Sequence, residues 1–354
     1  MPKIAAFSLL ATVLLSAASA LAVAPGKGIQ VVPDEAHRRV DIKVDGKPFT
    51  SYIWPTSLKK PTLYPLITEE GIPVTRGYPL EPRAGERVDH PHHAGLWFNY
   101  GNANGFDFWN NSDAIPPDTR SKMGTILHTK VVSATSGADR GELVVESAWI
   151  TGANEQILNE TTRYVFRRRS SVRFIDQAVT LTALDRVVFK DDKEGLLGMR
   201  VARWLESPTE KGGAFTDANG NSTKVDAAPT DATGSTPATG VYLTSEDVKG
   251  DAAWGTRGKW CALTGHTRSH TVTIAIFDHP ENPGYPTYWH ARGYGLFAAN
   301  PLGQSIFDPK KPPFDYTLEK GQSVTFRYRI ALYSGATTSP ELNRESGAFA
   351  TEPR

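Results

Sequence analysis

The amino-acid sequence predicts an all-β protein, a large antiparallel β-sandwich with few helices. Apolar and polar residues alternate with a period of two in several segments, whereas no segment shows the apolar repeat of an amphipathic helix. Turn-forming residues are frequent, with 31 Gly and 25 Pro among 354 residues. Many strands joined by turns are typical of sandwiches and barrels.

The first strands are expected between residues 40 and 53. Val40, Ile42 and Val44 alternate with charged residues, and the turn pair Asp45-Gly46 follows them. More apolar residues come after the turn, so the stretch predicts a β-hairpin. Alternation, or a long β-branched run without a turn, predicts further strands at residues 143–149, 163–167, 172–184, 271–276 and 324–332.

Residues 209–257 differ in composition from the rest of the chain. They are rich in Gly, Ala, Thr, Ser, Asp and Pro and contain few large apolar residues before Val241. Because strand patterns lie on both sides, we expect an irregular insertion within a single domain that covers residues 25–340. Residues 341–354 are expected to form a tail.

Residues 1–24 predict a signal peptide. Lys3 precedes an apolar run from Ile4 to Leu15, and three Ala-x-Ala patterns follow between residues 18 and 24. Cleavage there would export the protein to the periplasm or the extracellular space; an uncleaved anchor is the alternative. No later segment has the roughly 18 apolar residues needed to span a bilayer, so no membrane span is expected after the signal peptide.

Charge and motifs exclude several classes of protein. The chain has 39 basic and 38 acidic residues, without the basic surplus that nucleic-acid binding requires. The GxxxxGK[ST], GxGxxG and GxSxG signatures of nucleotide-binding proteins and serine hydrolases are absent. The single cysteine, Cys261, excludes an internal disulfide. No nucleic-acid partner is therefore expected, and the composition predicts no particular oligomeric state.

Histidines and aromatic residues concentrate in residues 87–109. His90, His92 and His93 lie within four residues, and in an extended chain His90 and His92 would face the same side. The aromatic residues around them are Trp97, Phe98, Tyr100, Phe106, Phe108 and Trp109. Loops seldom carry so many aromatic residues without a pocket or a core role, although a surface loop is the alternative.

A second polar segment covers residues 277–303. Asp278 and His279 end a strand, and His290 and Arg292 then share one face of an extended segment. Polar groups at the end of a strand are candidates for the mouth of a site. The alternative is a rigid loop in which these groups satisfy buried backbone atoms.

A shorter charged segment at residues 190–195 is the third candidate. Its composition is that of a solvated turn, and Met199 and Arg200 follow it. Glu194 belongs to a site only if the fold carries it to the histidines.

The motifs that carry a family resemblance are Asp89–His93 with Gly95–Phe98, Asn104–Gly105 with Asp107–Trp109, Lys193–Gly195, Trp289–His290 with Arg292, Tyr294–Pro301, and Trp254-Gly255 with Trp260. They resemble the bacterial family labelled "methane oxygenase PmoA", a domain of unknown function, over roughly residues 30–335. The resemblance implies a galactose-mutarotase-like β-supersandwich, often encoded beside genes for sugar degradation and sugar oxidation.

A sugar presents apolar C–H faces and hydroxyl edges, which aromatic rings beside Asn, Asp, His and Arg can bind. We therefore predict a secreted carbohydrate-active protein with a small-molecule carbohydrate partner. It is expected to be an enzyme of epimerase, lyase or hydrolase type that uses His/Glu acid–base chemistry. The predicted catalytic residues are His92, His290, Glu194 and His279, with His92 and His290 as the proton-transfer pair. The predicted substrate-binding residues are His93, Trp97, Asn104, Asp107, Trp109, Arg200, Trp289, Arg292 and Asn300.

Two other functions fit the same residues. His90, His92 and His279 could ligate a divalent metal in an oxygenase or hydrolase, whereas the leading prediction includes no metal or other cofactor. A non-catalytic sugar-binding or envelope protein would use the same aromatic and polar groups. Measured turnover and metal content distinguish these alternatives.

Overall fold

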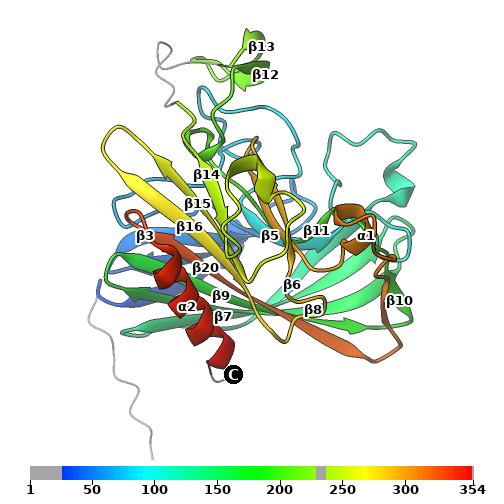
Figure 1. The fold of residues 1–354 in the computed structure, drawn as a ribbon. Coiled ribbons are helices and arrows are strands. Elements are labelled where there is room, and N and C mark those ends of the chain that lie inside the picture. Colours follow the sequence, from blue (N-terminus) through cyan, green and yellow to red (C-terminus); the bar gives the residue numbers. More distant parts are fainter. Residues whose placement is uncertain (1–25, 229–236, 353–354) are drawn as a thin grey trace, which may run out of the picture.

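The computed structural model describes residues 26–228 and 237–352 and contains two antiparallel sheets of eight strands each (Figure 1). In spatial order, the first sheet consists of β1 (Ile29–Asp34), β2 (Arg39–Val44), β3 (Lys47–Ile53), β4 (Thr62–Leu63), β5 (Leu96–Tyr100), β11 (Gly195–Arg200), β18 (Leu296–Asn300) and β17 (Tyr288–Arg292). The second consists of β14 (Val241–Thr244), β15 (Trp260–His266), β16 (Thr271–Asp278), β20 (Ser323–Tyr333), β9 (Val172–Ala183), β8 (Gln156–Arg169), β7 (Arg140–Thr151) and β6 (Gly124–Thr135). The signal peptide predicted at residues 1–24 lies outside the described residues.

The predicted all-β fold class is confirmed. The hairpin expected at residues 40–53 is the pair β2–β3, and the other five predicted segments lie in β7, β8, β9, β16 and β20. These strands could be predicted because every second side chain is buried, which leaves an alternating apolar pattern in the sequence. On β20, Val324, Phe326, Tyr328, Ile330 and Leu332 are all buried in the core. One core cluster contains side chains from both sheets, so the sheets pack face to face as a sandwich.

The remaining elements are short. Two small sheets have two strands each: β10 (Val187–Phe189) pairs with the distant β19 (Tyr316–Leu318), and β12 (Lys211–Thr216) forms a hairpin with β13 (Ser222–Ala227). Among the described residues, the helices are α1 (Gln304–Phe307), α2 (Ser339–Thr351), η1 (Glu35–His37), η2 (Arg120–Lys122), η3 (Arg203–Leu205) and η5 (Gly250–Ala253). None of the helices in this described part is long and apolar enough to cross a membrane.

The stretch 209–257, expected to be an irregular insertion, is more ordered than its composition predicts. The β12–β13 pair projects from the body of the molecule (Figure 1). β14 pairs with β15 and forms an edge of the second sheet, so the end of this stretch is part of the sandwich. The ring of Tyr242 on β14 is completely buried in the core, which anchors this strand to the sandwich.

The tail expected at residues 341–354 is instead helical as far as Thr351. Helix α2 covers the outer face of the second sheet, where Leu342 and Phe349 join a small cluster that includes Trp260 and Phe277. Burial of this apolar stripe stabilises the helix at the end of a β-rich chain.

The first turn of α2 has a capping box. Thr338 Oγ1 accepts a hydrogen bond from the Glu341 amide, and the Glu341 carboxylate accepts one from the Thr338 amide at 2.8 Å. We expect Thr338→Ala to lower the free energy of unfolding by about 1 kcal/mol, because the amide loses its acceptor. Urea unfolding measures the change, and Thr338→Ser, which keeps the hydroxyl, is the control. Equal stability of the two variants would contradict a role for the cap.

Candidate active site

The candidate site lies on the outer face of the first sheet. Strand register places Trp97 of β5, Gly198 of β11, Ala298 of β18 and His290 of β17 in one row across four strands. The two central positions are small. A Cβ at Gly198 would lie 2.6 Å from the Trp97 ring, so only glycine fits beneath that indole. His290 stands at the far end of the row from Trp97.

His290 and Glu194 are neighbours on this face, and Lys193 forms an ion pair with the other Glu194 oxygen, Oε1, at 3.1 Å. His290 Nδ1 lies 3.9 Å from Glu194 Oε2 and 3.0 Å from the Lys193 carbonyl oxygen. A carbonyl oxygen can only accept, so a hydrogen bond to it requires Nδ1 to carry the proton and leaves Nε2 with a lone pair. The two side chains are mostly enclosed, with 4% of His290 and 14% of Glu194 exposed.

The environment moves the two pKa values in opposite directions. Burial lowers the pKa of His290 to about 3, and the charge of Arg292 adds to this effect, so the imidazole is neutral near neutral pH. Burial raises the pKa of Glu194 above its ordinary value; Lys193 opposes the rise, and Asp192 adds to it. Near neutral pH the neutral imidazole can accept a proton, and the raised pKa makes the Glu194 carboxyl a better proton carrier than an ordinary carboxyl.

Glu194 owes its position to a network around the preceding loop. The Asp192 carboxylate accepts a hydrogen bond from the Glu194 amide at 2.9 Å, and the Tyr100 hydroxyl accepts one from the Asp192 amide. Asn300 Nδ2 donates to the Asp192 carbonyl at 2.8 Å, and the Gly101 amide donates to the Glu194 carbonyl at 2.7 Å. Asn300, predicted as a substrate contact, therefore fixes the loop that carries Glu194.

Arg292 provides a cation at the exposed side of this pair. Its guanidinium lies 5.4 Å from the Trp254 ring centre and 5.9 Å from that of Tyr294. Arg292 and Trp254 are exposed and Tyr294 is half-buried. None of the ion pairs formed within the described ranges involves Arg292, so its hydrogen-bond donors are available to a ligand.

Four parallel rings join the two polar segments of the sequence. Tyr294, His90, His93 and Trp97 stack in that order, with centre-to-centre distances of 5.3, 4.9 and 5.2 Å. The column brings residues 87–109 and 277–303 together, as the prediction of one shared site requires. It also differs from the expected extended segment, because His90 has a φ of 41° and its carbonyl accepts the His93 amide. Because of this turn, the His90 ring stacks on that of His93, which an extended chain would place on the opposite side from His90 and His92.

Two buried arginines lie beneath the ring column. Arg76 and Arg200 donate to the same oxygen of Asp89, Oδ1, at 2.5 and 2.7 Å. Neither arginine side chain is exposed, and the Arg200 guanidinium lies 4.8 Å from the Tyr294 ring centre. Arg200, predicted to bind substrate, is therefore enclosed and supports Tyr294 from below.

His92 is not a partner of His290. The His92 ring contacts those of His90 and His93, and among the described residues no hydrogen bond, ion pair or ring contact joins His92 to His290. Lys60 donates to the His92 carbonyl at 2.7 Å and lies 5.1 Å from the Trp97 ring centre. Burial, with the charge of Lys60, lowers the pKa of the His92 imidazole to about 2. The predicted His92–His290 proton-transfer pair is therefore not assembled.

His279 and Trp289 also lie away from this face. His279 follows β16 of the second sheet and packs edge-on against Phe349 of α2, with 5.1 Å between ring centres. Trp289 points into the core between the sheets, on the opposite side of β17 from His290. Alternation along β17 forces this separation, because neighbours on a strand face opposite sides.

The other predicted contacts have structural partners. Asn104 bonds the backbone of Arg186 and Val188, and Asp107 accepts from the amides of Trp109 and Asn110. Trp97 and Trp109 are buried, at 1% and 0% exposure, so they form the base of the site and not exposed plates.

The alternative metal ligands are not gathered at one point. His90 and His92 are neighbours, with 5.6 Å between ring centres, but His279 lies on the second sheet. Across residues 26–228 and 237–352, no group of three or more His, Cys, Asp or Glu side chains has an arrangement that could hold a metal ion.

A family model described as "Family of unknown function (DUF6807)" matches residues 39–346. The chain belongs to this family. The match covers both polar segments and the whole candidate site. The methane-oxygenase label of the sequence resemblance is not supported by it. No curated protein matches the sequence.

Solved structures similar to this DUF6807 chain include three from bacteria. A putative aldose 1-epimerase from Escherichia coli K12 is 9% identical, with a TM-score of 0.34, and covers 86% of this chain and 99% of its own. A galactose 1-epimerase from Lactobacillus acidophilus is 9% identical, with a TM-score of 0.38 and coverages of 83% and 97%. A galactose mutarotase-like protein from Clostridium acetobutylicum is 10% identical, with a TM-score of 0.37 and coverages of 87% and 99%.

Sequence reasoning missed four residues that build the site of this DUF6807 protein. Asp89 and Tyr294 lie inside the motifs that carried the resemblance, so the motifs themselves mark both as candidate site residues. Arg76 and Lys60 lie outside every motif, and nothing in the local sequence marks them as buried cations. Their burial follows only from long-range packing.

Proposed function

We propose that this protein is a carbohydrate-active enzyme that transfers protons on a bound sugar, with Glu194 and His290 as its acid–base pair. The observation that carries the proposal is the 3.9 Å contact between the Glu194 carboxyl and the His290 imidazole, beside an exposed Arg292. Both catalytic groups sit at strand ends or on strands of a rigid sheet, which favours a fixed geometry.

The pair supports the interconversion of sugar anomers. His290 Nε2 would accept the proton of the anomeric hydroxyl while the Glu194 carboxyl donates one to the ring oxygen, so that the ring C–O bond breaks and a carbonyl forms. Closure on the other face reverses both transfers, and the proton balance is restored. A general acid and a general base of this kind each contribute about 10²–10⁴-fold to the rate.

Glycoside hydrolysis is less well supported by the same residues. It normally needs two carboxyl groups on either side of the scissile bond. Asp192 and Asp107 are the carboxylates whose charges act on Glu194. Asp192 accepts a hydrogen bond from the Glu194 amide, and Asp107 accepts from the backbone amides of Trp109 and Asn110 and from Asn110 Nδ2. The groups beside the Glu194 carboxyl are Lys193 and His290 and not a second free carboxylate, which favours proton transfer over hydrolysis.

Arg292, Tyr294 and His90 suit the recognition of a sugar. The guanidinium can donate to hydroxyl oxygens, and the exposed parts of the rings can contact C–H groups. His90 and Arg292 are both exposed, so these contacts need no rearrangement of the core.

Anomer exchange measured by NMR saturation transfer on a panel of aldoses tests the function, with hydrolysis of aryl glycosides followed in parallel. We expect accelerated exchange for at least one aldose and none with Glu194→Gln. Sugar binding without exchange or hydrolysis would instead support the non-catalytic alternative. Activity that a chelator abolishes and added metal restores would support the metal-dependent one.

The pH dependence of kcat/KM tests the role of each group. If Glu194 donates a proton, kcat/KM should fall as the pH rises through its pKa, which burial raises above the ordinary carboxyl value. His290 gains its proton only near its pKa of about 3, so the rate should hold through weakly acidic pH. Lys193→Ala removes the cation that lowers the Glu194 pKa and should move the alkaline limb to higher pH. An unmoved limb would contradict the assignment of the acid.

A further inference from the structure

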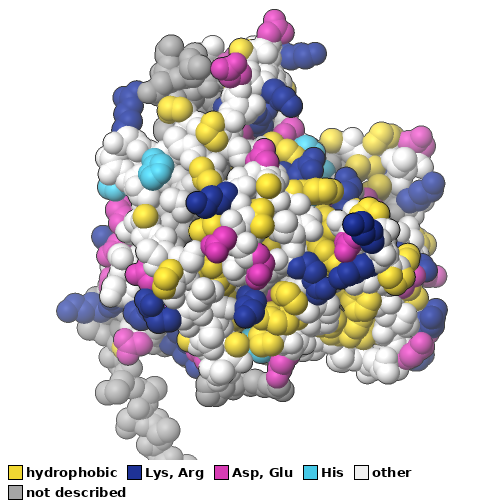
Figure 2. Space-filling model, viewed as in Figure 1, with side chains coloured by type: hydrophobic (Ala, Val, Ile, Leu, Met, Phe, Trp, Pro, Cys, Tyr) yellow, Lys and Arg dark blue, Asp and Glu magenta, His cyan; other side chains and the backbone are white. Residues whose placement is uncertain are grey.

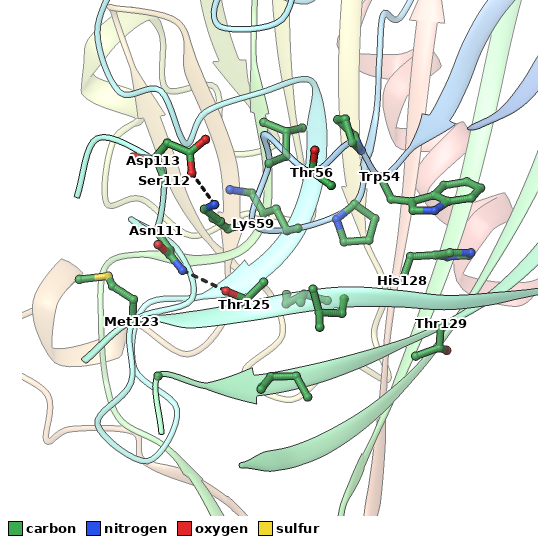
Figure 3. A pocket seen from close by; sticks show the side chains of 18 of the residues that line it. Trp54, Thr56, Lys59, Asn111, Ser112, Asp113, Met123, Thr125, His128 and Thr129 are labelled. Atoms are coloured by element: carbon green, nitrogen blue, oxygen red, sulfur yellow. Dashed lines mark hydrogen bonds and ion pairs between the residues drawn. The ribbon is translucent and has the colours of Figure 1, made fainter. Parts of the chain in front are cut away.

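A large pocket lies between the edge strand β6 and the segment 54–61, and it shares Lys60 with the surroundings of the candidate active site. Its volume is about 1000 Å³. Figure 3 shows Trp54 and His128 toward one end and Asn111, Asp113 and Met123 toward the other. The Ile126 amide donates to the Lys59 carbonyl at 2.9 Å and ties the segment to the strand. A pocket of this size can enclose several linked sugar units.

One end of the pocket is built from planar rings. The Trp54 and His128 rings lie face to face, with 4.0 Å between centres and 31° between planes. His128 Nδ1 is 3.1 Å from the Tyr52 hydroxyl, which fixes the imidazole from below. Burial lowers the pKa of His128 to about 4, so this ring is uncharged near neutral pH. Both rings are half-buried and contribute to the pocket wall.

The rest of the wall is rich in neutral hydrogen-bonding groups. Hydroxyl and amide side chains come from Thr56, Asn111, Ser112, Thr125, Thr129 and Asn154. Aromatic rings beside hydroxyls and amides match the C–H faces and hydroxyl edges of a carbohydrate chain.

The wall carries four basic and two acidic side chains. Lys59 and Asp113 pair with each other at 2.5 Å (Figure 3). Lys60 directs its ammonium to the His92 carbonyl, outside the ring-lined end. The remaining charges are Glu35, Arg38 and Arg120, so the wall, with Lys60 included, carries about two positive charges. Basic and acidic side chains are likewise interspersed on the face seen in Figure 2. The surplus of positive charge is small, which favours a neutral ligand over a polyanion.

We propose that this pocket binds a neutral oligosaccharide, with Trp54 and His128 as its stacking platform. The proposal concerns a separate site and does not depend on catalysis by Glu194 and His290. The pocket shares Lys59, Lys60, Asn111 and Ser112 with a small hollow beside His92. An oligosaccharide bound here would therefore lie on the same side of the molecule as His92.

Isothermal titration with neutral hexasaccharides tests the proposal, using cellohexaose, xylohexaose, mannohexaose and maltohexaose, with hexagalacturonate as the anionic comparison. At least one neutral probe is expected to bind, and Trp54→Ala should weaken it about tenfold or more by removing the stacking surface. The double variant Thr56→Val/Thr129→Val keeps the side-chain volumes and should also weaken binding. Thermal melting shows whether Trp54→Ala is folded. If it is not, the double threonine variant is the test of the pocket.

Two controls separate this site from the active site. Val132→Ala changes an exposed residue of β6 that does not line the pocket, and Glu194→Gln changes the proposed acid–base pair. Both variants should bind the neutral probe like the wild type. The proposal is overturned if no neutral hexasaccharide binds or if hexagalacturonate binds more tightly. It is also overturned if Glu194→Gln weakens binding while the pocket variants do not.

Discussion

Glu194→Gln and His290→Ala are each expected to lower kcat by about 10²–10⁴-fold, because each removes one of the two groups that move protons. Gln fills the same volume as Glu, so the Glu194 variant should keep its melting temperature and circular dichroism spectrum. The rate is measured as anomer exchange on the aldose that the wild-type protein accepts. The size of this loss would make it the largest effect of any substitution on this face.

His279→Ala is the matched control for His290→Ala. Both substitutions remove a mostly buried imidazole, but His279 packs against α2 on the second sheet. Its loss should leave kcat unchanged. His92→Ala is the second comparison, because the His92 ring contacts His90 and His93 and, among the described residues, has no contact with His290. A loss with His92→Ala as large as that with His290→Ala would contradict the assigned pair.

The double variant Glu194→Gln/His290→Ala shows whether the two groups act as a unit. If they work in one concerted proton transfer, the double variant should lose little more activity than either single variant. Independent roles would instead give losses that multiply. Multiplied losses would show that the two groups act in separate steps.

The strands of the sandwich could be predicted from sequence because burial on one side leaves a period-two signature. β20 is the clearest case, since five alternating apolar residues all face the core. β14 carried no such signature: only four residues long, it is held mainly by the buried ring of Tyr242. Helix α2 was missed for a similar reason, because a short helix that packs a few side chains on a sheet has only a weak apolar repeat.

The candidate site could be predicted only in part. The meeting of residues 87–109 and 277–303 followed from their composition, and the ring column through His90 and Tyr294 shows the contact. The direction of each side chain did not follow, because the turn at His90 changes which residues face together. Glu194 became a partner of His290 through the pairing of β11, β18 and β17, which no local pattern specifies.

Asp89→Ala is expected to lower the free energy of unfolding by about 3–5 kcal/mol, the typical cost of leaving a buried charge without its partner. Arg76 and Arg200 are both fully buried and share this one carboxylate oxygen. Burial, together with the neighbouring Arg200, lowers the pKa of Arg76 to about 9, so it is still charged near neutral pH. Asp89→Asn keeps a hydrogen-bond acceptor and should cost less.

Urea unfolding at several pH values measures this contribution and its origin. Burial alone would raise the pKa of Asp89, but its hydrogen bond with His90 and the charges of Arg200 and Arg76 hold it well below the usual range. A carboxylate with a lowered pKa stabilises the fold above its unfolded pKa of about 3.9, and this contribution is lost as the pH falls toward the folded value. The stability difference between wild type and Asp89→Ala should therefore be full near pH 7 and shrink in acid below about pH 4. Asp41→Asn, which breaks the half-exposed pair with Arg39, is the control and should cost about 1 kcal/mol or less. A difference for Asp89→Ala that is as small as this control would show that the two arginines do not depend on the shared carboxylate.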